Sequence, residues 1–182
     1  MEQYLNAIVK RTVQKYLFSH IKSTKVVLGL AGTHPEEYIK ILPINQRTIL
    51  VDFNPVNPFI RRNSIIGEFD LLLQERALVT FVDCDFCKSY KSNGDDLLYI
   101  YNKMKKNTVR NKYIAFTFSL RRTGLEDTIK WLSSNIPECK TTILPNAVSY
   151  NFGDRRYLKI LNPYLIQYRD SGDNMISGLI KL

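Results

Sequence analysis

Apolar residues recur at spacings of three and four between residues 2 and 20, which is the period of one helix face. The opposite face of this predicted helix is basic and carries Lys10, Arg11 and Lys15. We expect the apolar face to cover one side of a β-sheet, because an amphipathic helix gains most of its stability by burying that face. Contact of the basic face with a phosphate backbone is the alternative.

The pattern changes in the segment 25–55, which reads KVVLGLAGTHPEEYIKILPINQRTILVDFNP. Its first apolar run, up to Leu30, is typical of a buried parallel strand. Pro35 suits the first turn of a helix, where its missing N–H costs nothing, and we predict this helix from about His34 to Leu42. A second strand then ends at Asp52. This order of strand, turn, helix and strand is the first half of an α/β unit that handles nucleotides.

Strands and helices continue to alternate downstream, which predicts a mostly parallel sheet. The apolar runs within 77–87 and 113–124 are predicted strands, each followed by a stretch of helical spacing. Two late segments, 141–150 and 164–182, alternate as further strands. No internal repeat or linker divides the sequence, so we expect 1–182 to form a single domain with the N-terminal helix packed on the sheet.

The composition fits a protein with one sizeable core. The chain has 182 residues, of which 45% are hydrophobic and 24% are charged. No apolar run reaches the roughly 20 residues that cross a bilayer, and the N-terminus lacks the charged and apolar regions of a signal peptide. The three cysteines are an odd number, which fits a reducing compartment. We therefore expect a cytoplasmic protein without membrane association.

The charge is strongly basic, with 26 Lys and Arg against 17 Asp and Glu, and a formal net charge of +9. Such an excess favours a polyanionic partner, and nucleic acid is the first candidate. The basic residues are spread along the chain and not gathered in a tail, so a surface that serves only solubility is the alternative.

The turn after the first strand indicates which kind of cofactor would fit. A glycine-containing turn that opens a helix usually holds a diphosphate, because free N–H groups and the helix dipole favour negative charge there. Glu36 and Glu37 in the first helical turn would repel a diphosphate, whereas a cofactor with a positive sulfonium and no phosphate is not penalised. Asp52 ends the second strand, where an acid can hydrogen-bond ribose hydroxyls.

Residues 28–33, LGLAGT, and 51–55, VDFNP, resemble the first two motifs of the class I S-adenosylmethionine-dependent methyltransferases. The resemblance implies S-adenosylmethionine as cofactor and an α/β, Rossmann-like three-layer sandwich. Its mostly parallel, seven-stranded sheet would carry an antiparallel C-terminal strand inserted between the fifth and sixth strands. The first motif is degenerate, because no acid precedes Gly29 and Gly32, and His34 stands where a further glycine is common.

Later segments extend the resemblance. Gly67 and Glu68 resemble the Gly-Asp pair that follows the third strand and contacts adenine. DCDFC at 83–87 stands where the family's fourth motif faces the transferred methyl group. It and AFTFSLRR at 115–122 are similar to small phage and archaeal-virus methyltransferase-like proteins, which would place the chain in a host cytoplasm.

The fourth segment limits the chemistry. It contains no proline, so standard methylation of nucleobase amino groups is not supported. Cys84 and Cys87 are more simply core residues than a nucleophile. They lack the second ligand pair that a zinc site requires, so we expect no metal.

Open α/β sheets bind ligands at the carboxyl edge of their strands, and the loops that carry these motifs meet there. By the resemblance, the cofactor pocket is lined by Gly29, Ala31, Gly32, Asp52, Glu68 and Asp83. The catalytic residues that face the acceptor are Asp83, Asp85, Phe86 and Tyr90. Nucleic acid, DNA or RNA, would be the acceptor and would contact Arg61, Arg62, Lys88, Arg121 and Arg122.

Two other interpretations stay open. The degenerate first motif is also what a methyltransferase-like scaffold without cofactor would show, and such a scaffold would bind nucleic acid or a host protein. A dinucleotide-dependent enzyme is the second alternative, which Glu36, Glu37 and the broken glycine pattern disfavour. The sequence does not define the acceptor atom or the oligomeric state.

Overall fold

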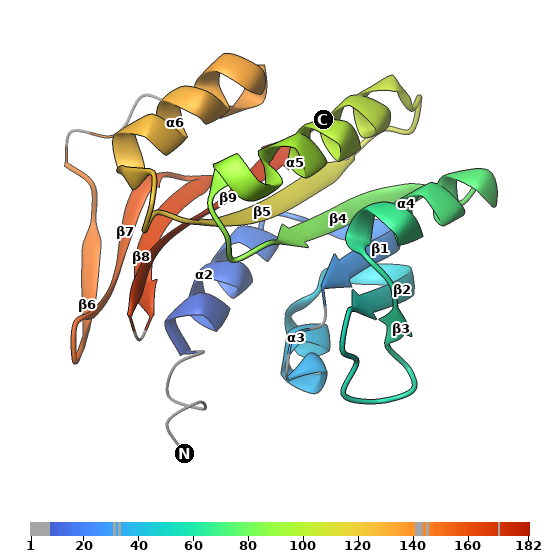
Figure 1. Ribbon diagram of the computed structural model, residues 1–182, viewed down its shortest axis with the longest axis horizontal. Coiled ribbons are helices and arrows are strands. Elements are labelled where there is room, and N and C mark those ends of the chain that lie inside the picture. The colour runs from blue at the N-terminus through green and yellow to red at the C-terminus, as the bar shows by residue number, and fades with distance from the viewer. Residues whose placement is uncertain (1–7, 31, 33, 141–143, 145, 171) are drawn as a thin grey trace.

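The computed structural model describes residues 8–30, 32, 34–140, 144, 146–170 and 172–182. Within these residues, nine strands form one sheet in the order β3-β2-β1-β4-β5-β9-β8-β7-β6, with helices on both faces (Figure 1). The helices are α2 (Ile8–Phe18), α3 (Pro35–Ile41), α4 (Ile65–Gln74), α5 (Tyr90–Lys106), α6 (Gly124–Asn135) and the short 3-10 helix η1 (Pro137–Cys139). The strands are β1 (Ser23–Leu30), β2 (Ile44–Asp52), β3 (Arg61–Arg62), β4 (Val79–Asp85), β5 (Tyr113–Ser119), β6 (Ser149–Gly153), β7 (Arg156–Asn162), β8 (Leu165–Asp170) and β9 (Asp173–Lys181).

The first five strands in chain order are parallel to one another. The order of the strands turns back at β1, which pairs with β2 on one side and with β4 on the other. The last strand, β9, lies between β5 and β8 and is antiparallel to both. This arrangement confirms the predicted Rossmann-like α/β fold and the antiparallel C-terminal strand beside the fifth strand.

The number of strands differs from the prediction, because nine strands and not seven form the sheet within the described residues. The additional pair is the hairpin of β6 and β7, which extends the sheet beyond β8. The predicted strand 141–150 is wrong for Leu144 and 146–148, which precede β6 and are not in a strand. Its residues 141–143 and 145 lie outside the described residues. The sequence pattern does not predict β7.

Each face of the sheet carries its own apolar core. Helices α2 and α3 cover one face, and helices α4, α5 and α6 cover the other (Figure 1). Successive residues of a strand point to opposite faces, so β4 contributes Phe81 to the core under α2 and Val82 to the core under α4 and α5. Asp83 and Asp85 follow Phe81 at every second position and therefore point toward the side of α2 and α3.

Helix α2 forms part of the predicted segment 2–20, of which residues 2–7 lie outside the described part. Its apolar stripe, Val9, Val13 and Leu17, is at most 1% exposed and packs in the core on that face. This packing places Lys10 of α2 against Asp85 at the carboxyl end of β4. Among the described helices, none combines the length and the apolar character needed to cross a membrane.

Gly178 in β9 is required by close packing in the centre of the sheet. A Cβ atom at this position would overlap the Phe116 ring and lie 3.1 Å from Leu165 Cδ1. Because Phe116 is 1% exposed and has little room to move, we expect Gly178→Ala to lower the free energy of unfolding by about 1–3 kcal/mol in urea denaturation. Gly172→Ala is the matched control, since a Cβ there meets nothing within 4 Å. Equal stability of the two variants would contradict the packing argument.

Candidate functional site

A cleft opens at the carboxyl edge of the sheet, at the point between β1 and β4 where the strand order turns back. Doubly wound sheets bind ligands at such a switch point. The cleft has a volume of about 320 Å³. The ends of β1, β2 and β4 with the loops that follow them, together with helices α2 and α5, line it through Lys10, Leu30, Gly32, Asp52, Phe53, Asp85, Phe86, Cys87, Lys88 and Asn93.

The two glycines of the first turn have different surroundings. Gly32 lines the cleft with a φ of +62°, a left-handed conformation that favours glycine, and a Cβ there would meet nothing within 4 Å. Gly29 instead lies under the Tyr38 ring, where a Cβ would overlap the phenol oxygen. Gly29 therefore makes room for Tyr38, whose side chain is 1% exposed. Ala31, the third predicted residue of this turn, lies outside the described residues.

Asp52 ends β2 at the cleft. One carboxylate oxygen, Oδ1, accepts a hydrogen bond from the Asn54 backbone N–H at 2.8 Å, which holds the side chain in place. The other oxygen has no partner among the described residues. Phe53 follows directly, lines the same cleft and is 69% exposed. An acid with a free oxygen thus stands beside an exposed aromatic ring.

Asp83 is buried beneath the cleft at the end of β4. Its side chain is 2% exposed and accepts a hydrogen bond from the Tyr38 hydroxyl at 2.7 Å. Burial raises the pKa of Asp83 to about 7, and the neighbouring Asp85 carboxylate adds to the rise. Asp83 therefore changes charge near neutral pH.

Asp85 forms an ion pair with Lys10 of α2, with 2.6 Å between the ammonium nitrogen and Oδ2. Cys87 donates a hydrogen bond to the other carboxylate oxygen at 3.0 Å. Burial alone would raise the pKa of Asp85, but the Lys10 ammonium and these hydrogen bonds outweigh it and lower the pKa. The two aspartates of DCDFC thus differ in charge, since Asp85 is ionised where Asp83 still holds its proton.

Neither cysteine of this segment is an activated nucleophile. Cys87 is exposed and is not a core residue, but loss of hydration beside Asp85 and the charge of that carboxylate raise the pKa of its thiol to about 12. Burial also raises the pKa of Cys84, which is fully buried in the core. Both thiols are therefore protonated at neutral pH, whereas a nucleophile must be a thiolate. In the described part of the chain, no group of three or more His, Cys, Asp or Glu side chains is placed to hold a metal ion.

Glu68 and Tyr90, two of the predicted site residues, lie away from the cleft. Glu68 is 2% exposed in the first turn of α4, where it binds the Arg61 guanidinium and accepts a hydrogen bond from Asn63. Glu68 follows the third strand, as the resemblance implies, but it lies within helix α4 and does not line the cleft. Ser64 caps this helix by accepting a hydrogen bond from the Gly67 N–H at 2.9 Å. Tyr90 opens α5 and packs away from the cleft.

The Tyr90 ring stacks on Trp131 of α6, with 5.0 Å between the ring centroids and 20° between the planes. Phe86, by contrast, lines the cleft with one side and stacks on Phe118 with the other, at 6.1 Å. Of the aromatic residues predicted to face the acceptor, Phe86 therefore reaches the cleft and Tyr90 supports the core between α5 and α6.

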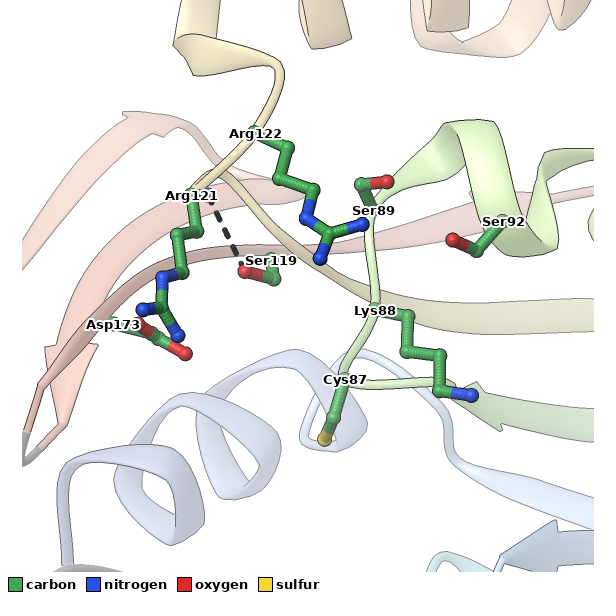
Figure 2. Close-up of a pocket in the computed structure, with 8 residues that line it drawn as sticks. All are labelled: Cys87, Lys88, Ser89, Ser92, Ser119, Arg121, Arg122 and Asp173. Carbon is green, nitrogen blue, oxygen red and sulfur yellow. Dashed lines mark hydrogen bonds between the residues drawn. The ribbon is translucent and has the colours of Figure 1, made fainter.

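A second cavity, of about 390 Å³, adjoins the cleft, and Cys87 and Lys88 line both. Figure 2 shows that the loop after β5 and the start of α5 form opposite walls of this cavity. Lys88, Arg121 and Arg122, three of the five predicted nucleic-acid contacts, line it together. Arg62 is exposed on the edge strand β3, away from this group.

Sequence reasoning missed four residues of the cleft region: Lys10, Tyr38, Phe53 and Asn93. Phe53 carried a signal, since it is an aromatic residue directly after the acid that ends a strand. No sequence signal marked Lys10 or Tyr38, because the residues that they contact on β4 are far from them in the sequence. Tyr38 and Asp83, for example, are 45 positions apart.

No protein-family model and no curated protein matches the sequence. Several solved structures are similar in fold. One is the N-methyltransferase NodS from Bradyrhizobium japonicum, with 11% identity, a TM-score of 0.47, and coverage of 100% of this chain and 98% of that chain. A second is precorrin 8W decarboxylase from Methanobacterium thermoautotrophicum, with 12% identity, a TM-score of 0.45, and coverage of 95% and 89%. A third is an S-adenosyl-L-methionine methyl transferase from Silicibacter pomeroyi, with 9% identity, a TM-score of 0.41, and coverage of 96% and 94%.

Proposed function

We propose that the chain binds S-adenosylmethionine in the cleft between β1 and β4 and transfers its methyl group to a nucleic acid, DNA or RNA. The observation that carries the proposal is Asp52. Its carboxylate ends β2 at the switch point of the sheet, faces the cleft, and keeps one oxygen without a partner among the described residues. Acids in this position of doubly wound folds bind the hydroxyls of a ribose.

Other residues of the cleft fit the rest of this cofactor. Asn93 Oδ1 is buried without a partner in the described structure, so the cleft holds an acceptor for an amino group. The exposed Phe53 ring would stack on adenine, and Gly32 would let the backbone approach the ligand. When bound, the cofactor would supply a methyl group on a positively charged sulfur.

Asp85 is the best candidate for a proton acceptor. Lys10 keeps its carboxylate ionised, and the carboxylate lies at the cleft rather than beneath it. An acceptor N–H or O–H placed against Asp85 would give up its proton as the new bond to carbon forms. Phe86 lines the cleft beside it and would exclude water from one side.

A nucleic-acid acceptor is supported by charge. The net charge is +9, and three of the exposed cations, Lys88, Arg121 and Arg122, together line the cavity that adjoins the cleft. Cations so placed bind phosphates and orient a polynucleotide without reading its sequence.

One observation favours a second candidate function, a methyltransferase-like scaffold that binds nucleic acid or a host protein without the cofactor. The Lys10 ammonium lies in the cleft against Asp85, where a sulfonium would meet a positive charge. A binding module needs no sulfonium and is not penalised by Lys10.

Calorimetric titration of the purified chain with S-adenosylmethionine and S-adenosylhomocysteine tests the proposal. We expect both compounds to bind, and we expect Asp52→Asn to weaken binding by about 1.5–3 kcal/mol, the range for a hydrogen bond to a charged group. The matched control is Asp154→Asn, which removes an exposed carboxylate in the turn between β6 and β7.

The outcomes separate the candidates. Binding of neither sulfur compound would reject the enzyme and leave the scaffold. Binding of NAD in their place would indicate a dinucleotide-dependent enzyme. Equal affinity of Asp52→Asn and of the unsubstituted chain would show that the cofactor binds elsewhere.

A further inference from the structure

The cavity between the β4–α5 loop and the β5–α6 loop concentrates positive charge. Lys88, Arg121 and Arg122 line it from two separate loops, and all three side chains are exposed (Figure 2). None of them forms an ion pair with an acidic residue in the described structure. Asp173, at the start of β9, is the acidic residue that lines the same cavity, and it also makes no ion pair there. The three cations therefore form no ion pair within the described residues, and Asp173 is the one carboxylate that lines the cavity with them (Figure 2).

Ser89 adds a hydroxyl that makes no hydrogen bond to the start of α5. It is 7% exposed, lines the cavity, and is the N-cap residue of α5. A serine at this position normally accepts a hydrogen bond from the helix backbone, but the Ser89 side chain makes no such bond. The hydroxyl stands where α5, a helix of 17 residues, presents its free N–H groups. No acidic residue in the first turn of α5 offsets the positive end of the helix dipole.

Backbone hydrogen bonds hold the two walls of the cavity together. The Ser119 N–H donates to the Lys88 carbonyl at 3.0 Å, which joins the end of β5 to the β4–α5 loop. The Leu120 N–H donates to the Asn174 carbonyl at 2.8 Å, and the Arg121 N–H donates to Ser119 Oγ at 3.3 Å. The cations therefore project from a backbone that is already in place, so a ligand need order only their side chains.

We infer that this cavity is a phosphate-binding site formed by Lys88, Arg121, Arg122 and the start of α5 with Ser89. Arginine forks and helix N-termini are the two recurring ways in which proteins bind phosphate, and both are present here. Because Lys88 and Cys87 also line the cleft, a group attached to the bound phosphate would reach Asp85. That this group is the methyl acceptor rests on the proposed function; the phosphate site itself does not.

Titration of the full chain with thymidine 5′-monophosphate, thymidine and inorganic phosphate tests the inference. We expect the monophosphate to bind at least about tenfold more tightly than thymidine, because the phosphate adds charge-assisted hydrogen bonds. In Arg121→Gln/Arg122→Gln, this preference should disappear. The control Arg110→Gln/Arg155→Gln removes two exposed charges from other loops and should retain the preference.

Ser89→Ala provides a variant that should fold as the unsubstituted chain does. Since the Ser89 hydroxyl caps nothing, its removal should leave the free energy of unfolding unchanged and weaken monophosphate binding about fivefold, as expected for one hydrogen bond. A loss of stability without a loss of phosphate binding would mean that Ser89 serves only the helix, and would overturn its part in the site.

Competition between inorganic phosphate and the monophosphate for the cavity identifies the source of the phosphate. If inorganic phosphate displaces the monophosphate, the cavity recognises the free anion; if it does not, the cavity recognises a phosphate ester. Both outcomes support the site, provided that Arg121→Gln/Arg122→Gln has lost the preference for the monophosphate over thymidine. No preference for the monophosphate over thymidine, or an unchanged preference in Arg121→Gln/Arg122→Gln, would overturn the inference. S-adenosylmethionine should bind the arginine variant normally, so a chain that binds phosphate but no cofactor would reject the proposed function alone.

Discussion

Asp83→Asn should gain stability relative to the unsubstituted chain as the pH rises from 4 to 8. We expect the difference between their free energies of unfolding to change by about 3–4 kcal/mol over this range. The unfolded chain releases the Asp83 proton near the ordinary pKa of 3.8, whereas the folded chain holds it to about pH 7. Rising pH between these two values therefore favours the unfolded state. Asparagine has no proton to lose, so the variant lacks this part of the pH dependence, while its amide oxygen still accepts the bond from Tyr38.

Thermal and urea unfolding at several pH values measure this difference. Asp154→Asn is the control, because the side chain of Asp154 is exposed and its replacement should give no such trend. Asp85 contributes in the opposite sense, since its lowered pKa stabilises the fold above the ordinary value and that contribution is lost in acid. This contribution of Asp85 is the same in both proteins, so it largely cancels in the difference between their free energies of unfolding. A stability difference that stays constant between pH 4 and 8 would show that Asp83 is ionised throughout.

Removal of Lys10 should have the second large effect. Lys10→Met leaves the Asp85 carboxylate, whose side chain is 12% exposed, without its cation. We expect a loss of about 2–4 kcal/mol in the free energy of unfolding at pH 8, somewhat less than for a fully buried pair. The loss should shrink as the pH falls, because the unpaired carboxylate takes up a proton at a higher pH than before.

The double variant Lys10→Met/Asp85→Asn separates the ion pair from the packing of α2. We expect it to recover most of the lost stability, since no charge is then left unpaired. Lys15→Met is the matched control on the same helix, where the side chain is exposed and no ion pair is recorded. If the double variant is as unstable as Lys10→Met, the lysine stem and not its charge holds α2 in place.

The parallel half of the sheet was predictable because its strands are buried on both faces. The sequences of β4 and β5 are near-continuous apolar runs. This pattern is typical of strands in a sheet that is covered by helices on both faces. The hairpin of β6 and β7 was not predictable in the same way. Polar and apolar residues do alternate in β6, where Tyr150 and Phe152 stand between Ser149, Asn151 and Gly153. Every residue of β6 is exposed, however, so the alternation does not mark a buried face. No helix was predicted for the apolar segment of α4, because its clearest helix signal, the cap by Ser64, was not recognised.

The candidate site was predictable where strand ends carry it. Asp52 and Asp85 end parallel strands, and parallel strands bring their carboxyl ends to one edge. The state of each acid was not predictable, because it depends on contacts between distant segments. Lys10 reaches Asp85 from α2, Tyr38 reaches Asp83 from α3, and Arg61 binds Glu68 away from the cleft.

The position of β9 bears on how the protein folds while it is being made. β9 joins β5 to β8, but it follows both of them in the sequence. A ribosome delivers residues from the N-terminus onward, so the two halves of the sheet cannot be connected until Asp173–Lys181 has emerged. Until then, β5 is an open edge strand with unpaired N–H and C=O groups, to which another nascent chain can add. We therefore expect β5 to be most exposed to wrong pairing in the interval between its own synthesis and that of β9.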